Sequence, residues 1–163
     1  MNYKLNSLVN VILDNRGKNP SYYTNSGYPV IDNYLIDNSP YPNLANVNRY
    51  IDEYLFNNFI RCKTIKDDLI LTLVGNGLGN CSLCPCNAVI IQNTIGLRFN
   101  NQVALQKYMF YCFTTKTDEI KKLNRGASQP SAKVSDVLEL EFNIPPLEQQ
   151  HHIVNTILSH FFF

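Results

Sequence analysis

The spacing of apolar residues along the chain predicts short elements of both helix and strand. Residues 5–13 carry apolar side chains at positions 5, 8, 9, 12 and 13, which predicts a helix or a helix that passes into a strand. Residues 28–31 and 67–74 are β-rich runs, and the second has the length of a buried strand. Residues 88–92 and 95–99 are predicted to form the next pair of strands.

Three further segments, 51–59, 102–113 and 117–123, have the apolar spacing of short helices. In the first of them, the side chains expected to be buried are Tyr54, Leu55 and Phe59. The third is followed by a basic residue and a glycine, the usual pattern of a helix C-terminus. Residues 37–50 are rich in asparagine and contain two prolines, so this segment is expected to be irregular and exposed.

The C-terminal segment begins with Pro145 and Pro146, which lack backbone N–H groups and suit the entry to a helix. Glu148 follows in the first turn, where the helix dipole favours a carboxylate. Behind it, intervals of three and four residues continue over about two heptads, the spacing of a coiled-coil seam. The seam positions are Leu147, Gln150, Val154, Ile157 and Phe161. We therefore expect a domain at 1–144 and, at 145–163, a helix that packs against a partner.

Composition and charge narrow the class of protein. The chain has 163 residues, the length of one domain, and its 45% hydrophobic content suffices for a packed core. A net charge of +1 mildly disfavours an independent tight binder of DNA, although a local basic face is what matters. No stretch approaches the roughly 20 apolar residues of a membrane span, and the first residues do not read as a signal peptide. The five cysteines are therefore expected to be reduced thiols in a cytoplasmic protein.

Two motifs suggest ligand sites but lack the full pattern. Residues 75–80 read GNGLGN; the dinucleotide fingerprint would need glycine in place of Asn80, and no helical pattern follows. A tight turn that uses the positive φ of glycine is the simpler interpretation. Cys81, Cys84 and Cys86 lack the second pair of ligands that a tetrahedral zinc site needs, so small thiols on a strand are favoured. We expect neither a metal nor a cofactor.

The sequence shows no arrangement typical of catalysis. The histidines are His151, His152 and His160, all on the predicted terminal helix and away from any loop with a candidate nucleophile. His151 and His152 would point about 100° apart on a helix, so they cannot share a metal as an i, i+4 pair would. No pair of carboxylates with an evident pocket emerges either. We therefore expect a non-catalytic protein.

Several motifs resemble the specificity subunit of type I restriction–modification systems. In that family a target recognition domain ends in an apolar-x-IPPL-E-x-Q segment and runs into a long helix. The residues that match this region are Gly126, Gln129, Pro130, Ile144, Pro145, Pro146, Leu147, Glu148, Gln150, Ile153 and Val154. Shorter matching blocks are Gly27, Pro29, Val30 and Ile31, and Asp68, Leu69, Ile70, Leu71, Thr72, Val74 and Gly75. Two departures are Gln149, where the family more often has Glu, and a terminal helix that is several turns shorter.

The resemblance and the predicted elements together imply an α+β target recognition domain. It would have a mixed or antiparallel sheet, flanking helices and the start of a coiled-coil-type helix. The resemblance implies that it reads one half-site of about three or four base pairs in double-stranded DNA, through base contacts and DNA shape. It would dock a modification (methyltransferase) subunit and, through it, the restriction subunit. A homodimer through the terminal helix is a further expectation, although about two heptads make a marginal coiled coil.

Polar loops carry the residue types that contact DNA. Lysine and arginine bind phosphates and fix the register, whereas amides and arginine contact base edges. The resemblance implies such contacts for Arg16, Lys18, Asn76, Asn80, Arg125 and Gln129. Ser128 and Lys133, close to Gln129 in the sequence, are further candidates. From the residues alone, an ordinary solvated surface is the favoured interpretation of these side chains.

Two alternatives from other classes stay open. One is a truncated, non-DNA-binding interaction domain or an inactive relic, whose shortened helix no longer reaches the modification subunit. The other is a small metal-binding protein built on Cys81, Cys84 and Cys86. In a truncated chain the apolar residues 161–163 would form a sticky end. We then expect self-association or aggregation that falls when these residues are removed.

Overall fold

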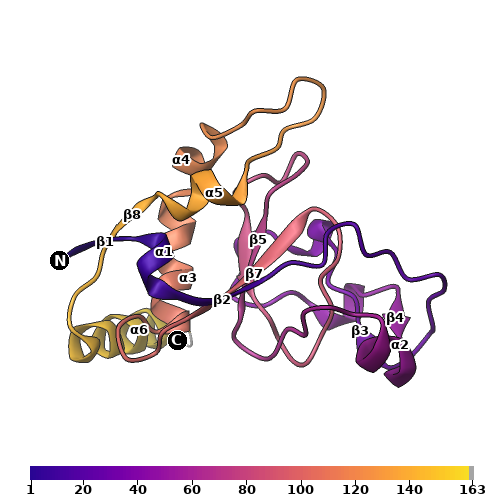
Figure 1. The fold of residues 1–163 in the computed structure, drawn as a ribbon. Helices are drawn as coiled ribbons and strands as arrows, with labels where there is room; N and C mark the ends of the chain where they lie inside the picture. The colour runs from indigo at the N-terminus through magenta and orange to yellow at the C-terminus, as the bar shows by residue number, and fades with distance from the viewer. Residues whose placement is uncertain (162–163) are drawn as a thin grey trace.

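The computed structural model describes residues 1–161, apart from the side chain of Phe161. Its centre is a four-stranded antiparallel sheet in the order β2-β7-β5-β6 (Figure 1). The strands are β2 (Val9–Leu13), β5 (Leu69–Thr72), β6 (Cys81–Leu83) and β7 (Thr94–Phe99). Alternate residues of β5 enter two different hydrophobic clusters: Leu69 and Leu71 lie in one and Ile70 in the other. Burial on both faces explains the uninterrupted apolar sequence of this strand.

Helices cover the side of the sheet that holds the largest hydrophobic cluster. α3 (Gln106–Thr115) packs against β5 and β6, and α6 (Leu147–Phe161) packs against α3. α4 (Thr117–Lys121) follows α3 after one residue. The fully buried rings of Phe99, Phe110 and Phe113 fill the space between these helices and the sheet.

The two ends of the domain meet beside this helical layer. β1 (Asn2–Lys4) pairs antiparallel with β8 (Glu141–Asn143). α1 (Leu5–Leu8) then leads directly into β2 and packs against α5 (Val134–Leu138). The segment before α6 is therefore tied to the first residues of the chain, and α6 starts from a fixed position.

A smaller region lies on the other side of the sheet from α3 (Figure 1). It holds β3 (Tyr28–Pro29), β4 (Tyr50–Ile51), α2 (Glu53–Asn58) and the 3-10 turns η1 (Asn33–Leu35) and η2 (Leu44–Asn46). The stacked rings of Tyr28 and Phe56, with centroids 3.7 Å apart, join β3 to α2.

The structure confirms most of the predicted elements and the α+β class. Residues 5–13 form the expected helix-to-strand unit, α1 and β2. The strand predicted at 88–92 is wrong, because Ala88 and Val89 form only isolated bridges, each to a different segment. Tyr54 was expected to be buried but is 68% exposed, whereas Phe56 is buried. The reason is that α2 is a short helix whose inner face carries Leu55 and Phe56. Phe59 comes after the helix and is only partly buried.

Candidate nucleic-acid interface

The loop between α4 and α5 projects from the molecule (Figure 1). One asparagine side chain closes its base. The Oδ1 atom of Asn124 accepts hydrogen bonds from the backbone N–H groups of Gly126, at 2.8 Å, and Ser131, at 2.9 Å. The N–H of Arg125 also donates to the carbonyl of Ser131 at 2.8 Å. The two ends of this projecting loop, residues 124–131, are therefore held together.

The projecting loop is attached to the end of β5. Gly75 donates its N–H to the carbonyl of Pro130 at 2.8 Å, and Ala132 donates to the carbonyl of Leu73 at 2.9 Å. Val74 and Ser131 form an antiparallel bridge between these two bonds. As a result the projecting loop lies beside the β5–β6 loop, residues 73–80, although the two are far apart in the sequence.

The tip of the projecting loop is a tight turn that requires glycine. A β-carbon on Gly126 would lie 1.7 Å from the carbonyl oxygen of Gln129, so another residue would displace that carbonyl. Ser128 and Gln129 are exposed on this turn. The turn thus presents a hydroxyl and an amide to solvent from a backbone that is anchored at its base.

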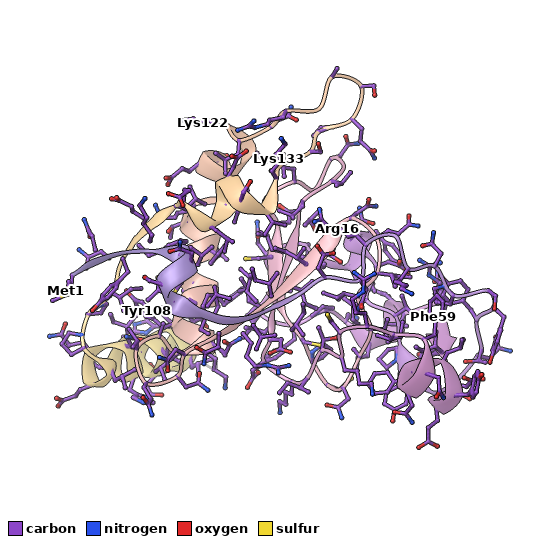
Figure 2. All side chains as sticks on the ribbon, viewed as in Figure 1. Met1, Arg16, Phe59, Tyr108, Lys122 and Lys133 are labelled. Atoms are coloured by element: carbon purple, nitrogen blue, oxygen red, sulfur yellow. The ribbon has the colours of Figure 1, made fainter. Side chains whose placement is uncertain are left out.

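Arg125, at the start of the loop, is held by a carboxylate. Its Nε lies 2.7 Å from Oδ2 of Asp136, and its Nη2 donates to Oδ1 at 2.9 Å. The two-pronged pair fixes the plane of the guanidinium, and 57% of the Arg125 side chain stays exposed. Lys133 is exposed on the other side of the loop. Figure 2 shows Lys122 and Lys133 at the foot of the projecting loop.

The β5–β6 loop is the tight turn that its glycines predict, and a strand follows it. Gly75 has φ +100° and Gly79 has φ +88°, both in the region that favours glycine. Asn76 is exposed. Asn80 is used inside the fold: its Nδ2 donates to the carbonyl of Ile36 at 3.3 Å, and its Oδ1 accepts from Asn38 at 3.4 Å. Of the two asparagines predicted to contact DNA, Asn76 has no side-chain hydrogen bond to another residue of 1–161, whereas Asn80 is partly exposed and bonded within the fold.

A buried asparagine ties the first loop of the chain to a distant segment. Asn15 is fully buried. Its Nδ2 donates to the carbonyls of Cys62, at 2.7 Å, and Ile90, at 2.9 Å, and its Oδ1 accepts from the N–H of Cys62 at 2.8 Å. The residues that follow Asn15 and those that flank Cys62 in the sequence are therefore brought together on the surface.

These neighbours form a cluster of four cations: Arg16, Lys18, Arg61 and Lys63. Arg16 pairs with Asp14 at 2.7 Å, and the hydrogen bond from Arg16 lowers the pKa of Asp14, with Arg61 adding to the effect through its charge. The Nζ atoms of Lys18 and Lys63 each lie 5.4 Å from a ring centroid, over Phe59 and Phe56 respectively. Figure 2 shows Arg16 and Phe59 in this part of the molecule. Sequence reasoning missed Arg61 and Lys63, because only the Asn15 hydrogen bonds place them here.

The terminal helix turns part of its predicted seam toward its own domain. Gln150 is fully buried, and its Oε1 accepts from the N–H of Leu105 at 2.9 Å. Its Nε2 donates to the carbonyls of Val103, at 2.7 Å, and Pro145, at 2.8 Å. Val154 is buried as well, whereas Leu147 and Ile157 are half-buried. The Phe161 side chain, and with it the predicted sticky end at 161–163, lies outside the described residues.

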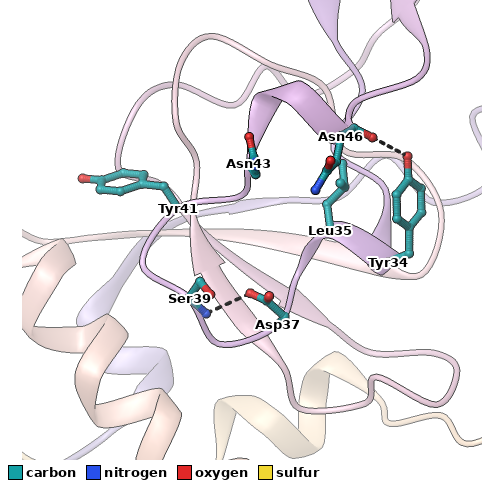
Figure 3. A pocket seen from close by; sticks show the side chains of 7 residues that line it. All are labelled: Tyr34, Leu35, Asp37, Ser39, Tyr41, Asn43 and Asn46. Atoms are coloured by element: carbon teal, nitrogen blue, oxygen red, sulfur yellow. Dashed lines mark hydrogen bonds between the residues drawn. The ribbon is translucent and has the colours of Figure 1, made fainter.

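A pocket of about 350 Å³ lies on the segment between β3 and β4 (Figure 3). It is lined by Tyr34, Leu35, Asp37, Ser39, Tyr41, Asn43 and Asn46. Two hydrogen bonds shape its wall, from the N–H of Ser39 to Asp37 at 3.0 Å and from the Tyr34 hydroxyl to the carbonyl of Asn46 at 3.1 Å. The charged group in its lining is a carboxylate, which disfavours a phosphate there, so we do not assign this pocket to DNA.

All five cysteines are free thiols. Cys81 and Cys84 are buried, and burial raises the pKa of each to about 12. Within residues 1–161, no group of three or more histidine, cysteine, aspartate or glutamate side chains could hold a metal ion. In the same part of the chain, no helix is both long enough and apolar enough to cross a membrane.

Comparison with known proteins decides the family. The model of the type I restriction modification DNA specificity domain matches residues 1–162. The chain belongs to this family. The family that the motifs around Gly126 and Pro145 predicted is thereby confirmed. A comparison with curated protein sequences gave no significant match.

Solved structures share the fold of this specificity domain. The S subunit of a type I restriction–modification system from M. genitalium superposes with a TM-score of 0.72 and 19% identity, over 98% of this chain and 38% of that chain. The HsdS subunit from Thermoanaerobacter tengcongensis gives 0.73 and 14% identity, over 98% and 36%. A third chain, from a study of complex assembly and conformational transition of the type I R-M system, gives 0.77 and 14%, over 98% and 37%. The chain spans less than two-fifths of the length of these proteins.

Proposed function

We propose that this specificity domain reads one half-site of about three or four base pairs in double-stranded DNA and is itself non-catalytic. The observation that carries the proposal is the attachment of the projecting loop to the end of β5. It brings Arg125, Ser128, Gln129 and Lys133 together with Asn76 from the β5–β6 loop. Amides, a hydroxyl and cations on an anchored backbone are the groups that contact base edges and phosphates.

The cation cluster supports binding to the DNA backbone. Arg16 pairs with the carboxylate of Asp14, whereas Lys18, Arg61 and Lys63 form no ion pair within residues 1–161, so the cluster keeps a net positive charge. Phosphate contacts of this kind fix the register of a protein on DNA and make its affinity depend on salt. In this proposal Arg16 and Lys18 act with Arg61 and Lys63, and the projecting loop supplies the base contacts.

The partners in the proposal are a modification (methyltransferase) subunit and, through it, the restriction subunit. Methyl transfer and cleavage belong to those subunits, and the work takes place in the cytoplasm, where their DNA substrate lies. An apolar groove of about 690 Å³ supports a protein contact at α6, with Phe110 and Tyr111 on one wall and Ile157 and Leu158 on the other. Leu147 and Ile157 are the seam positions that stay partly exposed for this contact, or for pairing of two copies.

Selection from a randomised pool of DNA duplexes tests the proposal. The protein is incubated with the pool at two salt concentrations, with and without a cognate modification subunit. We expect enrichment of one short motif, strongest when the modification subunit is present. Binding that falls steeply with salt but enriches no motif would show phosphate contacts without recognition of the base sequence. That result, or no binding by the folded protein in either case, would contradict the proposal.

A further inference from the structure

Asn33 is held at the edge of the candidate interface by the turn η1. The Asp32 carboxylate accepts from Nε of Arg49 at 2.8 Å, and the carbonyl of Asp32 accepts from the N–H of Leu35 at 3.0 Å. Ile31, just before it, donates its N–H to the carbonyl of Val89 at 2.8 Å. The backbone of Asn33 is therefore fixed on both sides, while its side chain stays partly exposed.

The side-chain amides of Asn33 and Gln129 both lie beside Gly75. The Nδ2 atom of Asn33 lies 3.6 Å, and the Nε2 atom of Gln129 lies 3.8 Å, from the point where a β-carbon on Gly75 would be. The two amides come from segments almost a hundred residues apart, yet both face the same residue. Gly75 has no side chain to separate them, and its own N–H is bonded to Pro130.

Neither amide is used by the fold. Among residues 1–161, no hydrogen bond to another residue involves the side chain of Asn33 or of Gln129, in contrast to the bonded amides of Asn15, Asn80 and Gln150. The side-chain amides of Asn15 and Gln150, which hold distant segments of the fold together, are bonded to backbone groups. Two unbonded amides that converge beside an anchored loop are instead positioned for an external partner with both donors and acceptors.

The chemistry of an amide selects among the bases. A side-chain amide carries one acceptor oxygen and an NH₂ donor, so it can make two hydrogen bonds to an edge that offers one donor and one acceptor side by side. In the major groove adenine offers N7 as acceptor and N6–H as donor, whereas guanine offers two acceptors. An amide that makes both hydrogen bonds to one base therefore favours adenine over guanine.

We propose that Asn33 and Gln129, together above Gly75, form a subsite that binds the major-groove edge of an adenine. This inference rests on the proposed function, because it names the base that one part of the reading surface takes. Asn33 was not among the residues predicted from sequence, and Gly75 provides the space that both amides share.

The test repeats the selection with Asn33→Ala and Gln129→Ala, alongside the matched control Asn101→Ala/Gln102→Ala. Asn101 and Gln102 are an exposed amide pair on the turn before α3, near α6 and away from the projecting loop. We expect each single variant to relax the preference for adenine at one position by roughly five- to a hundredfold. The control should keep the wild-type motif, and equal melting temperatures would show that all variants fold.

A modified base makes the test specific to adenine. Replacing that adenine by 7-deazaadenine removes the N7 acceptor, so it should weaken wild-type binding and have little effect on the single variant that lacks the amide bonded to N7. If wild type enriches a motif that both variants keep unaltered, or if the affected position is not adenine, the subsite is wrong. If wild type enriches no motif, the proposed function itself fails, which is a different result.

Discussion

The carbonyl oxygen of Gln129 occupies the place where any residue but glycine at position 126 would carry its β-carbon, 1.7 Å from that point. This close approach fixes the turn that presents Gln129. The resemblance to the family already included both residues, but the sequence did not show that one constrains the other.

Gly126→Ala should therefore lower the affinity for the selected DNA motif while leaving the stability of the fold almost unchanged. The added methyl group must push the Gln129 carbonyl away, which moves the amide out of position. We expect about a tenfold loss of affinity for the selected motif, the size of one lost base contact. Because the loop tip is exposed, the melting temperature should change little. Fluorescence anisotropy with the selected duplex measures the loss.

The control for this variant is Gly77→Ala. A β-carbon at Gly77 would make ordinary contacts, 3.5 Å from Nδ2 of Asn80 and 3.7 Å from Cγ2 of Thr72. It should bind like wild type. Equal affinities for Gly126→Ala and wild type would show that the turn does not position a DNA contact.

Arg61→Ala/Lys63→Ala tests the cation cluster. Each phosphate contact adds about 0.9 to the slope of log affinity against log salt, so losing two should reduce the slope by about two. Random and selected duplexes should be weakened alike, because phosphates carry no sequence information. Lys107→Ala, an exposed lysine on α3, is the control. A salt slope equal to that of wild type would show that Arg61 and Lys63 do not contact DNA phosphates.

Asn15→Ala should both destabilise the protein and disturb the cation cluster. The change leaves the N–H and carbonyl of Cys62 and the carbonyl of Ile90 without their partner. We expect a loss of about 3 kcal/mol in the free energy of unfolding, measured by urea denaturation. Asn10→Ala, an exposed position on β2, should change it by less than about 0.5 kcal/mol. Similar stabilities for the two variants would contradict the role of Asn15.

Gln150→Ala and Gln149→Ala separate a structural from an exposed glutamine on α6. Gln150 bonds to the backbone of Leu105, Val103 and Pro145, so its loss should cost about 3 kcal/mol in the free energy of unfolding. Gln149 is exposed, so its replacement should have almost no effect on stability. If Gln150→Ala were as stable as wild type but failed to bind the modification subunit, Gln150 would act at the protein interface instead.

Alkaline pH should destabilise the protein through its buried thiols. Burial raises the pKa of Cys81 and Cys84 to about 12, whereas unfolded thiols ionise near 8.5. Above that pH the unfolded state has lost protons that the folded state keeps, so the free energy of unfolding falls as pH rises. Urea denaturation at pH 8 and pH 10 measures the fall. Cys81→Ala/Cys84→Ala should show a shallower dependence, and an equal one would assign the effect to other groups.

The sequence by itself determined the family and most of the local elements, and it supplied most of the loops of the proposed interface. Apolar spacing located α1, β2, β5 and α6, and prolines and glycines marked the turns, because these signals act between residues close in the chain. The tertiary structure decided which polar residues meet. Asn15 bonds to Cys62, Gln150 bonds to Leu105, and Asn33 and Gln129 both lie beside Gly75. Such contacts between a side chain and a distant segment follow no period along the chain, so only the folded backbone places them.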